Sequence, residues 1–250
     1  MAEESGAEPK YLQIADALKA AIELGEYGPG DRLPGENVLA PQYGVAPMTA
    51  RRALRVLTSQ GLAESRKGAG FFVQAFHPVR RRGIQRLARD QWGSGKSIWA
   101  ADESRPLTVD QVTVEEVTPP AHIIRMLELG ERETACARSR RFVLEGRPVM
   151  LATSYLPFSL VAGSAITQAD TGPGGTYARL ADLGHAPVHF REEIRGRLPT
   201  SVEAAALGMS MERPVLKVCR TAFDADKRVV EVNEMTLDSA SYVLDYEFDA

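Results

Sequence analysis

The stretch from Gly28 to Val73 constrains what this chain can fold into more than any other, because helical periodicity there alternates with glycine turns. Upstream, apolar residues from Tyr11 to Ile22 recur at three- and four-residue spacing and predict the apolar face of a first helix, which ends at Gly25. A short second helix is predicted from Glu36 to Tyr43, although Pro41 inside it removes one helical hydrogen bond.

A third helix is expected to begin near Pro47, whose fixed φ suits a first helical position, and to end at Gly61. Its Leu54 faces inward. Two short β-prone runs follow at 62–64 and 71–73, joined by SRKGAG, whose glycines permit a hairpin tip. The order of helix, turn, helix and basic hairpin is typical of a winged helix-turn-helix module that binds DNA.

The polar residues of the third helix share one exposed face. Thr49 and Arg52 lie near one line along this helix, and Arg51 and Arg55 lie on a neighbouring line, as insertion into a major groove requires. Lys67 in the hairpin can contact phosphates or a minor groove. Arginines at helical spacing are also typical of an ordinary solvated face; the order of the elements favours DNA binding.

Charge is distributed unevenly along the chain. The net charge of −3 does not indicate a nucleic-acid partner, yet residues 51–89 hold ten basic side chains against the single acid Glu64. Residues 90–250 carry a balance of −7, so positive charge gathers where phosphates would bind. The RRR run at 80–82 is interpreted as a solvated linker, which is compatible with non-specific attraction to phosphates.

Residues 9 to 75 resemble the winged-helix domain of the GntR family of bacterial repressors. The motifs that carry the resemblance are GDRLPGE, MTARRALRVLTSQGL and KGAGFFV. The resemblance implies DNA contacts from Thr49, Arg51, Arg52, Lys67 and Gly68. The departures from the family pattern concern the operator sequence rather than DNA binding; they are Asn37, Ala46, Pro47, Ala69 and Phe71.

Length and composition predict two domains in a globular protein. The 250 residues are 44% hydrophobic, no apolar run approaches the ~20 residues that span a bilayer, and the acidic start is no signal peptide. We expect a cytoplasmic protein with no membrane partner, in which Cys136 and Cys219 are buried thiols rather than a disulfide or metal pair. The predicted domains are 1–75 (with 1–8 disordered), an arginine-rich linker at 76–94, and 95–250.

The last of these domains is predicted to be an antiparallel sheet with helices, which makes the whole chain an α+β protein. Alternating apolar residues and hairpin turns predict the strands, at 107–117, 134–144, 147–156, 187–198, 214–223 and 228–237. Helices are expected at 121–129, 177–183 and 201–207, the last with Thr200 and Glu203 as a capping box. His185 and His189 are four residues apart, but Pro187 between them argues against a metal site.

Residues 95 to 248 resemble the UTRA effector-sensing domain of the HutC subfamily, which shares the chorismate-lyase fold. The motifs are RRFVLEGRPVMLATSYLP, GGTYARLADLG, SVEAAALGM, PVLKVCRTAFDADKRVVEV and YVLDYEF. The resemblance implies a pocket for a small-molecule effector, lined by Ser97, Arg140, Tyr177 and Glu231.

Each pocket position also has a structural interpretation. On a strand, Arg138 and Phe142 share a face with Arg140, and an inward arginine needs an anion, either a ligand or a carboxylate such as Glu231. The glycines before Tyr177 form either an anion site at a helix N-terminus or only a turn.

The effector itself is predicted from the residues that differ from sugar-phosphate-sensing relatives. Where those relatives have a second arginine and a tyrosine, this chain has Phe142 and Leu237. This replacement predicts a less charged, more apolar effector, with one carboxylate or polar head on Arg140 and a body packed on Phe142 and Leu237.

These features together predict a transcriptional repressor that binds operator DNA as a homodimer and is released by a small molecule. One short helix contacts too few bases for a specific operator, so symmetry requires a dimer. A chorismate-lyase-type enzyme tethered to DNA is the alternative from another class, but the sequence contains no catalytic or metal-ligand constellation and implies no cofactor. A third possibility is a DNA-binding dimer whose second domain senses nothing.

Overall fold

A computed structural model describes residues 8–75, 78–83, 85–94, 98, 105 and 107–247 of the chain. The predictions made for residues 1–7 and for Ser97 lie outside these residues. The chain divides into two compact units, 1–77 and 78–250, and each is described by itself.

The first unit consists of three helices and a two-stranded hairpin. They are α1 (Lys10–Glu23), α2 (Glu36–Tyr43), α3 (Pro47–Ser59), β1 (Ala63–Arg66) and β2 (Gly70–Val73), with β1 and β2 antiparallel. This order confirms the predicted helix-turn-helix and wing. Gly44 ends α2 with φ of 61°, a left-handed backbone that glycine adopts without strain.

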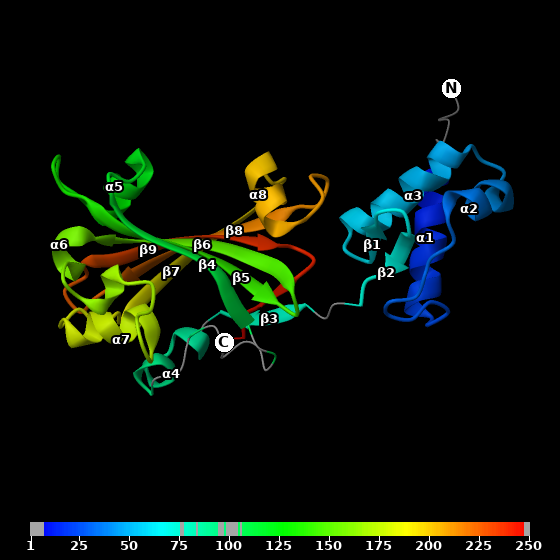
Figure 1. Ribbon diagram of the computed structural model, residues 1–250. Helices are drawn as coiled ribbons and strands as arrows, with labels where there is room; N and C mark the ends of the chain where they lie inside the picture. The colour runs from blue at the N-terminus through cyan, green and yellow to red at the C-terminus, as the bar shows by residue number, and fades with distance from the viewer. Residues whose placement is uncertain are drawn as a thin grey trace, which may run out of the picture. The chain divides into compact units, whose positions relative to one another are not determined.

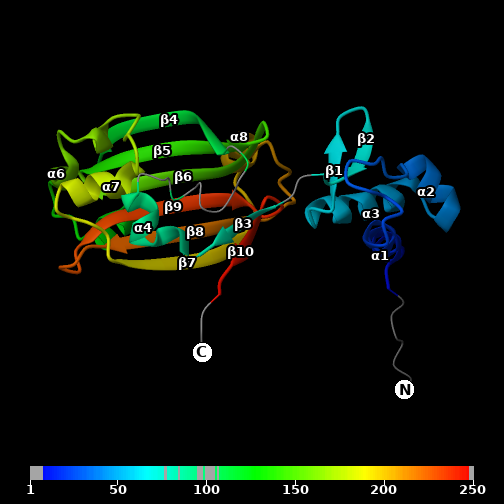
Figure 2. The same ribbon diagram turned by 90° about the horizontal axis from the view of Figure 1, so that it is seen from below.

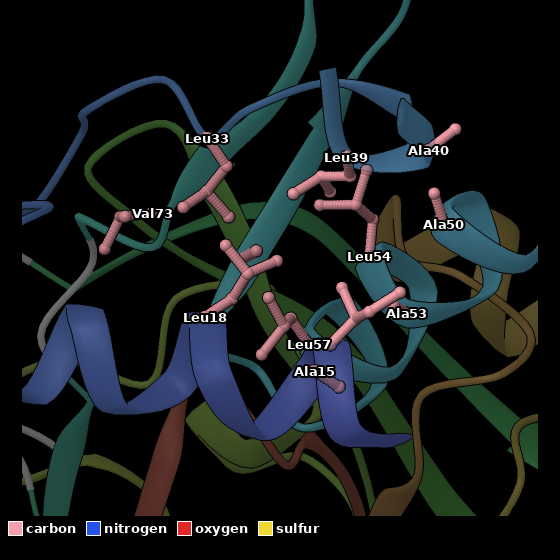
Figure 3. Packing of buried hydrophobic residues seen from close by; sticks show 12 residues of the cluster. Ala15, Leu18, Leu33, Leu39, Ala40, Ala50, Ala53, Leu54, Leu57 and Val73 are labelled. Atoms are coloured by element: carbon pink, nitrogen blue, oxygen red, sulfur yellow. The ribbon is translucent and has the colours of Figure 1, made fainter. Parts of the chain in front are cut away.

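The core of the first unit is formed where α1, α2 and α3 meet the hairpin. Leu54 of α3, predicted to face inward, is fully buried together with Leu57. They pack with Leu18 of α1, Leu39 of α2 and Val73 of β2 in one cluster (Figure 3). This packing fixes α3 in the unit and leaves its opposite face exposed.

The second unit is built on a six-stranded antiparallel sheet with the order β4-β5-β6-β9-β8-β7 (Figure 2). The strands are β4 (Leu107–Val117), β5 (Ala135–Leu144), β6 (Arg147–Pro157), β7 (His189–Arg197), β8 (Val215–Phe223) and β9 (Val229–Asp238). A tight turn at Glu145 and Gly146, with φ of 52° and 75°, joins β5 to β6 as the sequence predicts.

Helices cover both faces of this sheet (Figure 1). On one face lie α5 (Ala121–Leu127) and α8 (Ser201–Leu207), the latter begun by the predicted Thr200–Glu203 capping box. On the other face lie α4 (Arg89–Gly93) and α7 (Gly175–Asp182). The remaining short elements are α6 (Phe158–Val161) and the 3-10 turns η1 (Gln85–Leu87) and η2 (Ala165–Thr167).

A second, parallel pair of strands corrects the prediction for the RRR run. β3 (Val79–Arg82) pairs with β10 (Tyr242–Asp245), and its side chains alternate between buried and exposed. Arg81 is only 1% exposed, so the interpretation of this run as a solvated linker is wrong for Arg81. The cause is a buried carboxylate, Glu192, whose oxygens accept hydrogen bonds from Arg81 at 2.5 and 3.1 Å.

Two further predictions concern cysteines and membranes. Cys136 is buried and Cys219 half-buried, and both are free thiols. Across the described ranges, helices fall short of the length and apolarity needed to cross a bilayer.

Candidate nucleic-acid interface and ligand pocket

The exposed face of α3 carries three arginines, Arg51, Arg52 and Arg55, while Thr49 is half-buried at its border. The guanidinium of Arg52 lies over the Tyr11 ring, 3.9 Å from its centroid, which holds it by a cation–π contact. Arg51 lies 3.8 Å from a Glu36 carboxylate oxygen, and both side chains are well solvated. Such a pair contributes little, so Arg51 can exchange it for a base or phosphate at small cost.

The hairpin between β1 and β2 exposes the two wing residues that the sequence singled out, Lys67 and Gly68. Arg66 instead pairs with Glu64 at 2.6 Å and stacks over Phe72, 4.2 Å from the ring centroid. Gly68 has φ of 75°, a conformation that suits glycine at the tip. The structure therefore places a lysine at the wing tip beside a neutralised arginine.

The second unit contains a pocket of about 350 Å³ between the sheet and the loop that leads into α7. Its sheet side combines charged and polar side chains with Phe142 and two valines of β4, and its loop side is rich in glycine. Its lining includes Arg138, Arg140, Phe142, Asp170, Gly174, Gly175, Tyr177, Arg220, Glu231 and Asn233. The structure thus brings together four of the predicted effector residues: Arg140, Phe142, Tyr177 and Glu231.

A row of polar side chains crosses the sheet beneath this pocket. Strand register places Arg138 opposite Ser154, Ser154 opposite Asn233, and Asn233 opposite Arg220. The next residue in the row, on β7, is Glu192, which lies opposite Arg220. Because residues directly opposite in antiparallel strands lie on the same face, all five are on the side of the sheet that α7 covers.

The carboxylate of Glu231 is held by two neighbours. The Tyr177 hydroxyl donates to Glu231 Oε2 at 2.7 Å, and Arg220 Nη2 lies 3.9 Å from the same oxygen. Burial raises the pKa of Tyr177 well above its ordinary value, so the hydroxyl keeps its proton. Arg220 thus takes the structural role that the sequence analysis offered to Arg138 or Arg140.

The two arginines of β5 have different partners. Arg138 donates to the backbone oxygens of Ile166, Gln168 and Ala169. Arg140 donates to the Ser154 hydroxyl at 2.9 Å. Desolvation lowers the pKa of Arg140 to about 10, which still leaves it positively charged at neutral pH. Arg140 is therefore a cation whose described hydrogen-bond partner is neutral.

The charge of the lining corrects one premise of the sequence analysis. Arg138 lies beside Arg140 in the pocket, Arg220 adds a third guanidinium, and Glu231 and Asp170 supply two carboxylates. The pocket is therefore not short of arginine, because Arg138, which alternation along β5 places on the same face as Arg140, also lines it, and Arg220 joins them from β8. Leu237 is not among the described lining residues.

Arg220 and Asn233 are among the lining residues that the sequence did not single out. The only signal for them was alternation, since Glu231 and Asn233 are two apart on β9 and so share a face. Which residue of β8 lies opposite depends on register, and register depends on packing rather than on local sequence.

Both units match protein-family models. Residues 103–242 match the UTRA domain, and residues 10–73 match the bacterial regulatory proteins of the gntR family. The chain is a GntR-family transcriptional regulator with a UTRA domain. This family membership confirms a DNA-binding regulator with an effector domain, and it excludes the enzyme alternative.

Relatives of this GntR-family regulator are similar over most of their length. A helix-turn-helix transcriptional regulator of Streptomyces coelicolor is 32% identical over 89% of this chain and 86% of its own. The mannosyl-D-glycerate transport and metabolism repressor MngR of Escherichia coli is 25% identical over 95% of each. The crystal structure of a GntR-family transcriptional regulator matches the fold with a TM-score of 0.64 at 24% identity, over 97% of this chain and 98% of that one.

Proposed function

We propose that this regulator is a repressor that binds a pseudo-palindromic operator as a homodimer and is released by a small anionic effector. The observation that carries the DNA-binding half is the exposed arginine face of α3 next to a wing that presents Lys67. Thr49, Arg51 and Arg52 are the proposed contacts on α3, with Lys67 and Gly68 on the wing. Repression is the role named for MngR, a relative that matches along nearly the whole chain.

The effector pocket supports an anionic ligand. Of its three arginines, Arg138 is bonded to backbone carbonyls and Arg220 adjoins Glu231, so Arg140 is the cation best placed for a ligand anion. Its guanidinium lies 5.7 Å from the Phe142 ring centroid, which gives the ligand an apolar wall beside the charge. The prediction of one anionic head on Arg140 is retained, with Tyr177 and Glu231 as further effector contacts.

The polar row continues from the pocket to β3, the strand that follows the first unit in the chain. Arg220 in the pocket lies opposite Glu192, and Glu192 holds Arg81 of β3. β3 begins two residues after the first unit ends in the chain. An effector that changes the electrostatic environment of Arg220 therefore acts on the strand that leads directly from the DNA-binding unit.

Selection of bound fragments from a genomic library tests the proposed function. We expect one preferred pseudo-palindromic site at physiological salt, and a thermal-shift screen of small anions should yield a compound that both raises the Tm and releases this site. Equal affinity for all fragments would contradict the proposal that the protein is a sequence-specific repressor. If a preferred site is found but no stabilising compound releases it, only the proposed control by an effector is contradicted.

We expect the full-length chain to form a dimer, held mainly through the sheet-rich second unit because it offers the larger surface. Light scattering at micromolar concentration should give twice the mass of one chain, with or without DNA. The isolated operator half-site serves as a control and should be bound far more weakly than the full site. A monomeric mass in solution would place dimerisation on the DNA instead.

A further inference from the structure

Asn233 carries a buried amide side chain in the lining of the pocket. It lies on β9, is 0% exposed and belongs to the pocket lining. Neither its Oδ1 nor its Nδ2 has a hydrogen-bond partner among the described residues. Buried amide groups are almost always paired, because leaving their donors and acceptors unmet costs free energy, so Asn233 calls for an explanation.

The neighbours of Asn233 in the row have other partners. On β6, the Ser154 hydroxyl accepts from Arg140 at 2.9 Å, and on β8, Arg220 approaches Glu231 at 3.9 Å. A leucine at this position would fill a similar volume without an unmet polar group. The sheet therefore presents one acceptor and one donor to the pocket, side by side and at a fixed place.

We infer that Asn233 determines effector specificity by binding two adjacent hydroxyl groups, one donating to Oδ1 and the other accepting from Nδ2. The inference rests on the proposed effector pocket and names the ligand more closely: an anion with a polyhydroxylated body, in place of the apolar body expected from the sequence. Glu231, two residues along β9 on the same face, offers a further acceptor to a hydroxyl. A hydroxyl suits this mixed lining because it both donates and accepts.

The spacing of the strands sets the size of such a ligand. Arg140 on β5 and Asn233 on β9 are separated by the single strand β6, hence by roughly 10 Å of sheet. Both side chains reach into the same pocket. A six-carbon chain with an anionic group at one end spans this interval, with its hydroxyls over Asn233.

Matched pairs of six-carbon anions test the inference by calorimetry on the full-length protein. Gluconate is compared with hexanoate, and sorbitol 6-phosphate with hexyl phosphate, so that each pair differs in its hydroxyls and shares its anion. We expect the hydroxylated member of at least one pair to bind about 10-fold or more tightly than the alkyl member, and the pair that does so identifies the anion as carboxylate or phosphate.

Two variants assign this preference to Asn233. Asn233→Leu should remove the preference for the hydroxylated member while leaving the Tm of the ligand-free protein unchanged or higher, because no protein hydrogen bond is lost. Thr221→Val is the matched control, since the Thr221 hydroxyl is also buried without a described partner but points to the opposite face of the sheet. Asn233→Ala provides the same test should the leucine variant fail to fold.

Three binding results would overturn the inference. They are equal binding of hydroxylated and alkyl anions, binding of none of the four, and an unchanged preference in a folded Asn233 variant. A clear fall in the Tm of both ligand-free Asn233 variants, with the Thr221 variant unaffected, would likewise show that the amide is satisfied within the protein. If operator binding and its release by another compound persist in any of these cases, the proposed function stands while the specificity assigned to Asn233 fails.

Discussion

Replacing Glu192 with alanine is expected to lower the free energy of unfolding of the second unit by about 3–5 kcal/mol, the cost of removing one partner from a buried ion pair. The Glu192 side chain is 9% exposed and accepts hydrogen bonds from Arg81, Arg86 and the Tyr246 hydroxyl. The side chains of Arg81 and Arg86 are 1% and 0% exposed. Their charges would lose this carboxylate without gaining water.

Urea denaturation followed by circular dichroism measures this change as a lower midpoint for the second unit. Glu193→Ala is the matched control, since Glu193 is the next residue on β7 and is exposed, so its loss should change stability by less than about 0.5 kcal/mol. Glu192→Gln retains the shape and part of the hydrogen bonding and should fall between the two. Equal stability of the Glu192 and Glu193 alanine variants would contradict the role of the buried carboxylate.

The same ion pairs predict a pH dependence. Burial alone raises the pKa of Glu192, but the charges of Arg81 and Arg86 outweigh it and hold the pKa below its ordinary value. Because the pKa of Glu192 is lower in the folded than in the unfolded state, its ionised carboxylate contributes fully to the free energy of unfolding above the unfolded pKa, about 4.3. This contribution is lost as the pH falls through the folded-state pKa. The stability difference between wild type and Glu192→Ala should therefore be constant near neutral pH and shrink below about pH 4.

Local sequence was sufficient to predict elements whose apolar pattern is long or is bounded by proline, glycine or a clear turn. The helix that presents Arg51 is predictable because apolar residues recur at helical spacing between Pro47 and Gly61. The six long strands are predictable from alternation and from turns such as Glu145-Gly146. In both cases the periodicity that identifies the element also assigns its buried face.

Local sequence was not sufficient for β3 and β10. Each is four residues long, and they pair in parallel across more than 150 positions of the chain. Three consecutive arginines resemble a solvated linker because nothing near them in the sequence supplies an acid. The acid is Glu192, and it reaches Arg81 only through the folded sheet.

The pocket shows the same limit at the level of single residues. Alternation placed Arg138, Arg140 and Phe142 on one face, but it could not tell which face α7 covers. Arg220 and Asn233 face each other through the β8–β9 register, which no motif records. The charge of the pocket was therefore misjudged, although four of the residues named for it, Arg140, Phe142, Tyr177 and Glu231, lie in its lining.

Replacing Arg51 with alanine is expected to weaken operator binding by about 1–3 kcal/mol at each half-site, if the guanidinium makes a bidentate contact to guanine. A dimer has two half-sites, so the total is about 2–6 kcal/mol, or at least about 30-fold in Kd. The weak, solvated pair with Glu36 at 3.8 Å offsets little of this loss. Titration of the selected operator by fluorescence anisotropy measures the change.

Comparison with two other variants separates a base contact from a phosphate contact at Arg51. Lys67→Ala, at the wing tip, should weaken all DNA sequences similarly and reduce the salt dependence by about one phosphate per half-site. Arg51→Ala should instead flatten the preference for operator over a site altered at one base, while Glu36→Ala changes neither property. An Arg51→Ala protein that keeps its full preference for the operator would place sequence recognition on other residues of α3, of which Arg52, held over Tyr11, is the nearest.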